Sequence, residues 1–181
     1  MRKSATFSTT GVAFGFALVA GGIAVSFGQS NRPDQWKQWE FLVGDWVGEG
    51  AGKPGEGTGG FTFERQLDGN VLVRRNKADY PAQGGRPAFS HEDLMIVFPD
   101  PGSKRTRAVY FDNEGHVINY TAEFSNGGQT LVLLSDEVPS TPRFRLTYTR
   151  MGEGTVEIAF EMAPPGQQAF TPYTKGQAHR K

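Results

Sequence analysis

The sequence predicts an all-β fold, an antiparallel meander of about ten strands that closes into a barrel after one short N-terminal helix. Short segments of strand-like alternation recur at roughly 8–12-residue spacing from position 46 to the end of the chain. The 24 glycines are spread along the chain rather than pooled in one tract, as expected for many tight turns. No second helical pattern separates the strands, so parallel βαβ units are not expected. Closure is expected because it removes exposed sheet edges.

The composition narrows the classes of function. A chain of 181 residues suits one domain, and its 19 basic and 19 acidic side chains balance. Balanced charge gives no reason to expect nucleic acid or an anionic membrane as a partner. The chain has no cysteine, which excludes disulfides, thiolate metal sites and a cysteine nucleophile.

The N-terminal segment has the pattern of a secretory signal. Arg2 and Lys3 precede an apolar stretch over 12–27 that is rich in glycine and alanine. We expect a signal peptide over 1–28 and a mature domain over 29–181, periplasmic or secreted. The alternative is an uncleaved membrane anchor, but five glycines within positions 11–28 weaken a spanning helix. After cleavage, no stable membrane insertion is expected.

One segment reads as helical. Over positions 33–42 the apolar residues Trp36, Trp39 and Leu42 recur at helical spacing, and Gly44 follows as a terminator. A short helix is therefore expected to precede the first strand.

The expected strands follow one another along the chain. Turn signals such as Asp68-Gly69 and Asn113-Glu114-Gly115 separate them. The segments are 46–51, 60–67, 71–79, 91–98, 105–112, 116–124, 130–135, 143–150, 155–162 and 170–180. A barrel of more than about eight strands usually leaves interior room for a ligand.

A motif stands where the first strand begins. Gly44-Asp45-Trp46 resembles the Gly-x-Trp signature that opens the first strand of lipocalins and fatty-acid-binding proteins, members of the calycin superfamily. In those families a basic residue near the end of the last strand packs over the Trp. The resemblance implies that Arg180 stacks on the Trp46 indole, with Gly44, Trp46 and Arg180 forming a structural motif.

A longer stretch extends the resemblance over roughly residues 40–181. The run GDWVGEG at 44–50 is similar to the opening of nitrobindin-like bacterial domains, which are ten-stranded haem-binding barrels. The ending FTPYTKG at 170–176 is similar to their last strand. The family's haem-ligating histidine falls at Tyr173 here, and His179 lies nearer the C-terminus. The resemblance thus implies haem as a possible cofactor, with Tyr173 as the iron ligand only if haem is bound.

The histidines do not form a metal site. His91, His116 and His179 are widely separated, and the only local cluster is His91-Glu92-Asp93. On a strand, His91 and Asp93 share one face while Glu92 takes the other, so the three cannot converge on one ion. Common enzyme motifs are absent as well, so the chain is more readily interpreted as a non-enzyme, with no catalytic residues assigned.

Strand alternation leaves several side chains with two possible directions. Arg74 and Arg75 fall on opposite faces, so one of them points inward. Arg145 and Glu157 lie opposite the apolar residues of their own strands. They are surface groups if the apolar face is interior, or an internal pair if the cavity is polar.

The sequence therefore favours a barrel that binds a small apolar or amphipathic molecule in its interior. The expected ligand-binding residues are Arg75, Tyr148 and Tyr173, which would fix the polar end of the ligand. Three alternatives remain open: a haem protein of the nitrobindin kind, a small cofactor-free enzyme using Arg75 or His91, and an envelope interaction module with a filled barrel.

Overall fold

A computed structural model describes residues 34–49 and 57–181. The expected signal peptide lies outside these ranges. Within them, no helix has the length and apolar character needed to cross a membrane.

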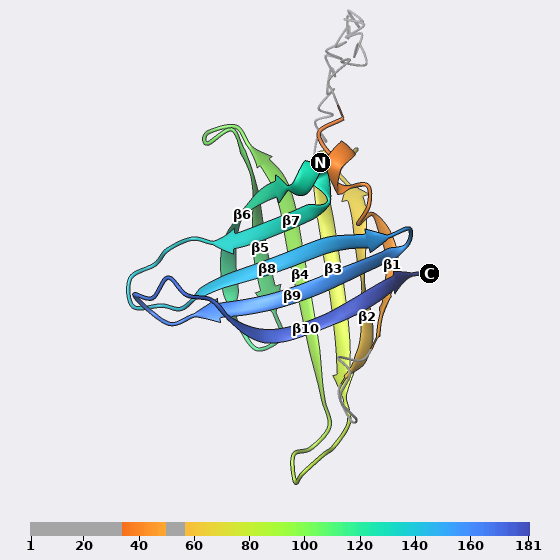
Figure 1. The fold of residues 1–181 in the computed structure, drawn as a ribbon, viewed down its shortest axis with the longest axis vertical. Coiled ribbons are helices and arrows are strands. Elements are labelled where there is room, and N and C mark those ends of the chain that lie inside the picture. The colour runs from red at the N-terminus through yellow and green to blue at the C-terminus, as the bar shows by residue number, and fades with distance from the viewer. Residues whose placement is uncertain (1–33, 50–56) are drawn as a thin grey trace, which may run out of the picture. The chain divides into compact units, whose positions relative to one another are not determined.

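The described residues form one closed antiparallel barrel of ten strands, which confirms the all-β meander (Figure 1). Each strand pairs with the next in sequence, and β1 closes the barrel against β10. The strands are β1 (Gly44–Gly48), β2 (Thr58–Gln66), β3 (Val71–Tyr80), β4 (Phe89–Asp100), β5 (Arg105–Asp112), β6 (Val117–Ser125), β7 (Thr130–Ser135), β8 (Arg143–Gly152), β9 (Thr155–Ala163) and β10 (Thr171–Arg180).

The two ends of the barrel differ. Residues 34–43 pack at one end, beside the β2–β3 turn and the short turn η2 (Asn126–Gly128), and we call this the closed end. The β3–β4 hairpin projects at the opposite end, which we call the open end (Figure 1).

The expected N-terminal helix is wrong in type. The segment contains only a 3₁₀ turn, η1 (Lys37–Trp39), with backbone bonds from Trp39 N to Trp36 O and from Leu42 N to Trp39 O, each 2.8 Å. A 3₁₀ geometry has three residues per turn, so side chains at every third position share one face. Trp36, Trp39 and Leu42 have that spacing, and all three are buried. The tighter turn therefore points these three side chains into the core.

The closed end is an aromatic plug in which two indole N–H groups donate hydrogen bonds. Trp39 packs edge-on against Phe124 with ring centroids 5.4 Å apart. The indole of Trp46 donates from Nε1 to Leu42 O at 2.8 Å, and that of Trp36 donates to a carbonyl of the β2–β3 turn at 2.6 Å. Burial of these rings removes a large apolar area from water, and the indole N–H groups of Trp36 and Trp46 keep hydrogen-bond partners.

Arg180 joins the last strand to the entry of the first. Its guanidinium carbon lies 4.7 Å from the Trp46 ring centroid, and its Nη2 donates to Phe41 O at 3.0 Å. Nη1 donates to Val43 O. Gly44 has φ +116°, and a Cβ there would lie 2.7 Å from Arg180 Nη1. The backbone conformation therefore favours glycine, and a Cβ at this position would also displace the end of the Arg180 side chain.

Candidate functional site

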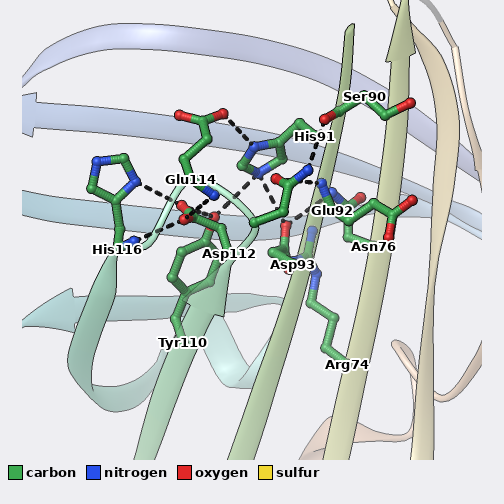
Figure 2. A network of polar contacts seen from close by, with 11 residues as sticks. Arg74, Asn76, Ser90, His91, Glu92, Asp93, Tyr110, Asp112, Glu114 and His116 are labelled. Carbon is green, nitrogen blue, oxygen red and sulfur yellow. Dashed lines mark hydrogen bonds and ion pairs between the residues drawn. The ribbon is translucent and has the colours of Figure 1, made fainter.

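A charged pair lies inside the barrel on strands β3 and β4. Arg74 and Asp93 are only 6% and 9% exposed, and Arg74 Nη1 donates to Asp93 Oδ1 (Figure 2). Asn76, two residues further along β3, donates from Nδ2 to Asp93 Oδ2 at 2.9 Å. Both carboxylate oxygens of this buried acid are therefore bound, as a buried charge requires.

His91 extends the pair toward the open end. Its Nε2 lies 3.5 Å from Asp93 Oδ2 and 3.2 Å from the Tyr110 hydroxyl. Its Nδ1 lies 3.1 Å from Glu114 Oε1 (Figure 2). With both ring nitrogens engaged, His91 is held as a fixed charged group rather than as a free base.

Asp112 organises the turn between β5 and β6. It accepts from the Tyr110 hydroxyl at 3.2 Å and pairs with His116 Nδ1 at 2.8 Å. The backbone amides of Glu114 and His116 donate to its other oxygen at 3.0 and 2.9 Å. We call the whole set the polar network: Arg74, Asn76, His91, Asp93, Tyr110, Asp112, Glu114 and His116. It runs from the barrel interior to an exposed turn.

The surroundings fix the charges of the network. The contact with Asp93 raises the pKa of His91 to about 9, against an opposing effect of burial and with further help from Glu114. Burial alone would raise the pKa of Asp93, but Arg74, His91 and Asn76 outweigh it and keep that pKa below its ordinary value. At neutral pH, His91 is therefore a cation and Asp93 an anion.

The Tyr148 hydroxyl is buried beside the pair, in contact with the Arg74 side chain. Arg74 Nε is buried without a hydrogen-bond partner within the described part of the chain. Burial raises the pKa of Tyr148 to about 12, partly offset by the nearby Arg74, so the phenol stays protonated. The Tyr148 ring packs against Phe61 and Phe63, each with ring centroids 5.8 Å away. Aromatic side chains thus surround the contact between Tyr148 and Arg74.

Small residues form a row beside this wall. Ala178, Gly48, Gly59 and Ala78 are successive cross-strand neighbours on β10, β1, β2 and β3, and the row continues to His91 on β4. Ala78 shares the inward face of Arg74 because it lies four residues further along the strand. None of these four residues carries more than a methyl group. Glycine at position 59 also allows close approach of β3, because a Cβ there would collide with the backbone of Lys77 and Ala78.

Aromatic side chains on β8 and β9 face the interior near the open end. Phe144 and Phe160 stack with centroids 5.6 Å apart, and with Ile158 they pack against the core. All three are only partly buried, whereas the inward residues at the closed end are fully buried. Solvent therefore reaches apolar, inward-facing surface from the open end.

The structure places Arg75 on the outside of the barrel. It lines a hollow of about 720 Å³ over the outer face of β1–β5, with Thr62 and Leu94 as its cross-strand neighbours. The inward arginine is Arg74. From alternation alone, either Arg74 or Arg75 could point inward. The pairing of β3 with β4 decides between them, because it brings Arg74 to the buried Asp93.

Tyr173 lies at an irregularity of β10, between Pro172 and Thr174. Its side chain is 75% exposed and meets Phe160 edge-on with centroids 5.9 Å apart. A haem ligand needs an enclosed pocket with controlled polarity. The surroundings of Tyr173 do not fit that role, and we derive no haem chemistry from it. Among the described residues, no group of three or more His, Asp or Glu could hold a metal ion.

The charged residues of β8 and β9 lie on the outer face. Arg145 pairs with Glu161 at 2.6 Å, and Glu157 pairs with Lys175 at 3.0 Å. The surface alternative for Arg145 and Glu157 is thus confirmed. His179 also lies on this face, where its Nε2 is 2.7 Å from Glu49.

Sequence reasoning did not select Asn76, Asp93, Tyr110 and Asp112 as a site. The sequence nevertheless contains a signal for this site. In β3, β4 and β5, polar residues occupy positions that alternation assigns to the inward, otherwise apolar face. The inward sets are Leu72, Arg74 and Asn76 on β3; Asp93, Met95 and Val97 on β4; and Ala108, Tyr110 and Asp112 on β5. Polar groups in core register need partners, so such positions predict a buried network.

Comparison with known proteins adds no assignment. No protein-family model matches the chain, and no curated protein matches it.

Proposed function

We propose that this protein is an exported barrel of the calycin kind that binds a small amphipathic molecule in its interior. The observation that carries the proposal is the apolar, inward-facing surface of Phe144, Ile158 and Phe160, which is only partly buried near the open end of a closed barrel. A ligand whose apolar body covers these side chains would remove that surface from water.

The ligand would enter from the open end. Its apolar body would lie against Ile158, Phe160 and Phe144, which are inward-facing and partly accessible to solvent. Burying apolar area contributes about 25 cal/mol per Å². The row of small residues on β10, β1, β2 and β3 would accommodate the rest of the molecule.

Arg74 and Tyr148 would fix the orientation of the ligand. The polar network holds Arg74 in place through Asp93, whose other oxygen is bound by Asn76. A binding group that is already rigid loses little conformational entropy when the ligand arrives. The role of the network is thus to hold Arg74 in position before the ligand binds.

Titration of the mature protein, residues 29–181, with the neutral fluorescent dye N-phenyl-naphthylamine tests the proposal. We expect saturable one-to-one binding. Ala78→Phe fills the row of small residues and should weaken binding by at least about tenfold, which is about 1.4 kcal/mol. Lys77→Phe is the matched control, because it places the same side chain on the outer face and should leave affinity unchanged.

Two results would contradict interior binding. One is the absence of saturable binding by the wild-type protein. The other is an equal loss of affinity in the Ala78→Phe and Lys77→Phe variants, which would place the dye on the outer surface. Native mass spectrometry of the protein as purified would also show whether a small molecule accompanies it.

A further inference from the structure

We propose that two copies of this protein form a two-fold symmetric dimer by packing face to face through the outer surface of β3, β4 and β5. These three strands are neighbours in the barrel (Figure 1). The dimer goes beyond the interior binding proposed above, because this surface lies on the outside. Apolar side chains that face outward and two nearby charges without an ion pair within the described residues lead to it.

The outward face of β4 is apolar, although it lies on the outside of a barrel. The run LMIVF at 94–98 contains no polar residue. Its second and fourth residues, Met95 and Val97, are buried in the core, so the other three side chains point outward. A strand with one face in water normally alternates apolar and polar residues, whereas a strand covered on both faces is apolar throughout. The sequence of β4 is therefore typical of a strand that is covered on its outer face as well.

The neighbouring strands extend this surface. Ile96 lies between Val73 on β3 and Val109 on β5. Leu94 lies beside Phe111 on β5. We call these five residues the outer apolar patch, and none of them is fully buried. The outer face of β8 and β9 differs, because it carries the paired charged residues described above. A contiguous apolar patch on an outer surface marks an interaction site.

Two charges of opposite sign lie beside the patch and form no ion pair within the described part of the chain. Arg75 on β3 is the cross-strand neighbour of Leu94, and Glu64 on β2 is the cross-strand neighbour of Val73. Both charged side chains are exposed. By contrast, the next cation along β3, Lys77, is paired with its neighbour on β4 at 3.2 Å. The border of the patch thus offers one cation and one anion to a partner.

A second copy of the chain complements this surface in both respects. In a two-fold dimer each copy uses the same surface, so the apolar patch of one meets the apolar patch of the other. Arg75 and Glu64 lie on adjacent strands in successive outward rows. A two-fold axis that passes between these rows brings Arg75 of each copy to Glu64 of the other. A surface with uncompensated charges of both signs is complementary to itself, which favours a second copy over a partner of a single charge.

Sedimentation equilibrium of residues 29–181 tests the dimer. This segment contains the whole described barrel and leaves out the apolar N-terminal stretch, which could associate by itself. We expect a monomer–dimer equilibrium. Ile96→Lys places a charge at the centre of the patch and should weaken dimerisation by at least about tenfold. Val132→Lys is the matched control, because it adds the same charge on the outer face of β7, between the buried Leu131 and Leu133, and should leave dimerisation unchanged.

Exchange of the two charges tests the two-fold arrangement. Arg75→Glu and Glu64→Arg alter only exposed side chains, so both variants should fold even if Ile96→Lys does not. Each alone should weaken dimerisation by at least about tenfold, because two like-charge contacts replace two ion pairs. An equimolar mixture of the two variants should dimerise as the wild type does, because each contact between the two different chains then joins opposite charges.

Three results would overturn the proposal. The first is a wild-type protein that stays monomeric at every concentration, and binding of that monomer to phosphatidylcholine vesicles would assign the patch to a lipid surface instead. The second is an equal effect of Ile96→Lys and Val132→Lys on dimerisation, which would place the interface elsewhere. The third is a mixture of the Arg75→Glu and Glu64→Arg variants that dimerises no better than either variant alone.

Discussion

The closed and open ends of this barrel are stabilised by opposite means. At the closed end, Trp36, Trp39 and Leu42 are buried, and the indole N–H groups of Trp36 and Trp46 donate to backbone carbonyls. Toward the open end, a charged network crosses β3, β4 and β5 and reaches an exposed turn (Figure 2). The same sheet thus changes from a fully packed core to a polar interior along its strands.

The difference indicates that the two ends have different roles. Apolar packing without unsatisfied atoms gives stability and needs no partner. A buried ion pair contributes little net stability compared with packed apolar side chains, so its retention points to a specific role. Arg74 lies beside Tyr148 in the barrel interior, where we propose that a ligand binds. The following changes test this comparison, from the largest expected effect to the smallest.

Trp39→Ala should remove the most stability. The side chain is 1% exposed and contacts Trp36, Phe63 and Phe124 in the plug. Loss of a buried Trp leaves a cavity, and we expect the free energy of unfolding to fall by about 4 kcal/mol. Urea denaturation measures this, with Val117→Ala, at an exposed site, as a control expected to change little. A loss below about 1 kcal/mol would mean that the closed end is not a packed core.

Asp93→Ala should be the next most damaging change. It leaves the Arg74 guanidinium buried without its counter-ion, at an expected cost of about 3 kcal/mol. Arg145→Ala is the matched control, because it breaks a pair on the outer face and should cost at most about 1 kcal/mol. Equal losses in the two variants would show that the interior pair is as well solvated as the outer one.

Much of the fold could be predicted from alternation and turn chemistry. The order of the strands follows from local signals such as Asp68-Gly69, and closure follows from the need to satisfy sheet edges. The type of the N-terminal turn was missed. Trp36, Trp39 and Leu42 are spaced by three residues, which suits a 3₁₀ turn better than an α-helix of 3.6 residues per turn.

The site could be predicted only in part, because it depends on register. Alternation places Arg74 and Arg75 on opposite faces, but only pairing with β4 brings Arg74 to Asp93. Tyr148 was selected from the sequence, and the structure places it inside, next to that pair. Tyr173 was selected as well and lies exposed at a strand irregularity. A local irregularity of this kind changes which face a residue takes, and periodicity cannot show it.

Gly44→Ala tests the junction between the plug and the first strand. The backbone at φ +116° is one that alanine adopts poorly, and the added Cβ would meet Arg180 Nη1. We expect a loss of about 2 kcal/mol in the free energy of unfolding. Gly115→Ala, also at positive φ but with open space around its Cβ position, separates the backbone cost from the clash. If both variants lose the same stability, the arginine contact is not a constraint.

Between about pH 6 and about pH 10, the pH dependence of stability should report on His91 at the open end. His91 has a folded-state pKa of about 9, raised above its unfolded value mainly by Asp93, so its contribution is fully present below about pH 6.5 and is lost as the pH rises through about 9. Because the side chain is 25% exposed, solvent screening reduces the effect to about 1 kcal/mol. Urea midpoints from about pH 6 to about pH 10 should therefore fall in the wild type. In His91→Gln, which keeps a polar side chain but cannot titrate, the part of this fall that is due to His91 should vanish.

A wild-type midpoint that stays constant over this range would mean that His91 is not held as a cation between Asp93 and Glu114. A slope retained in His91→Gln would assign the titration to another group, and the polar network would then lose its charged link between the interior pair and the exposed turn.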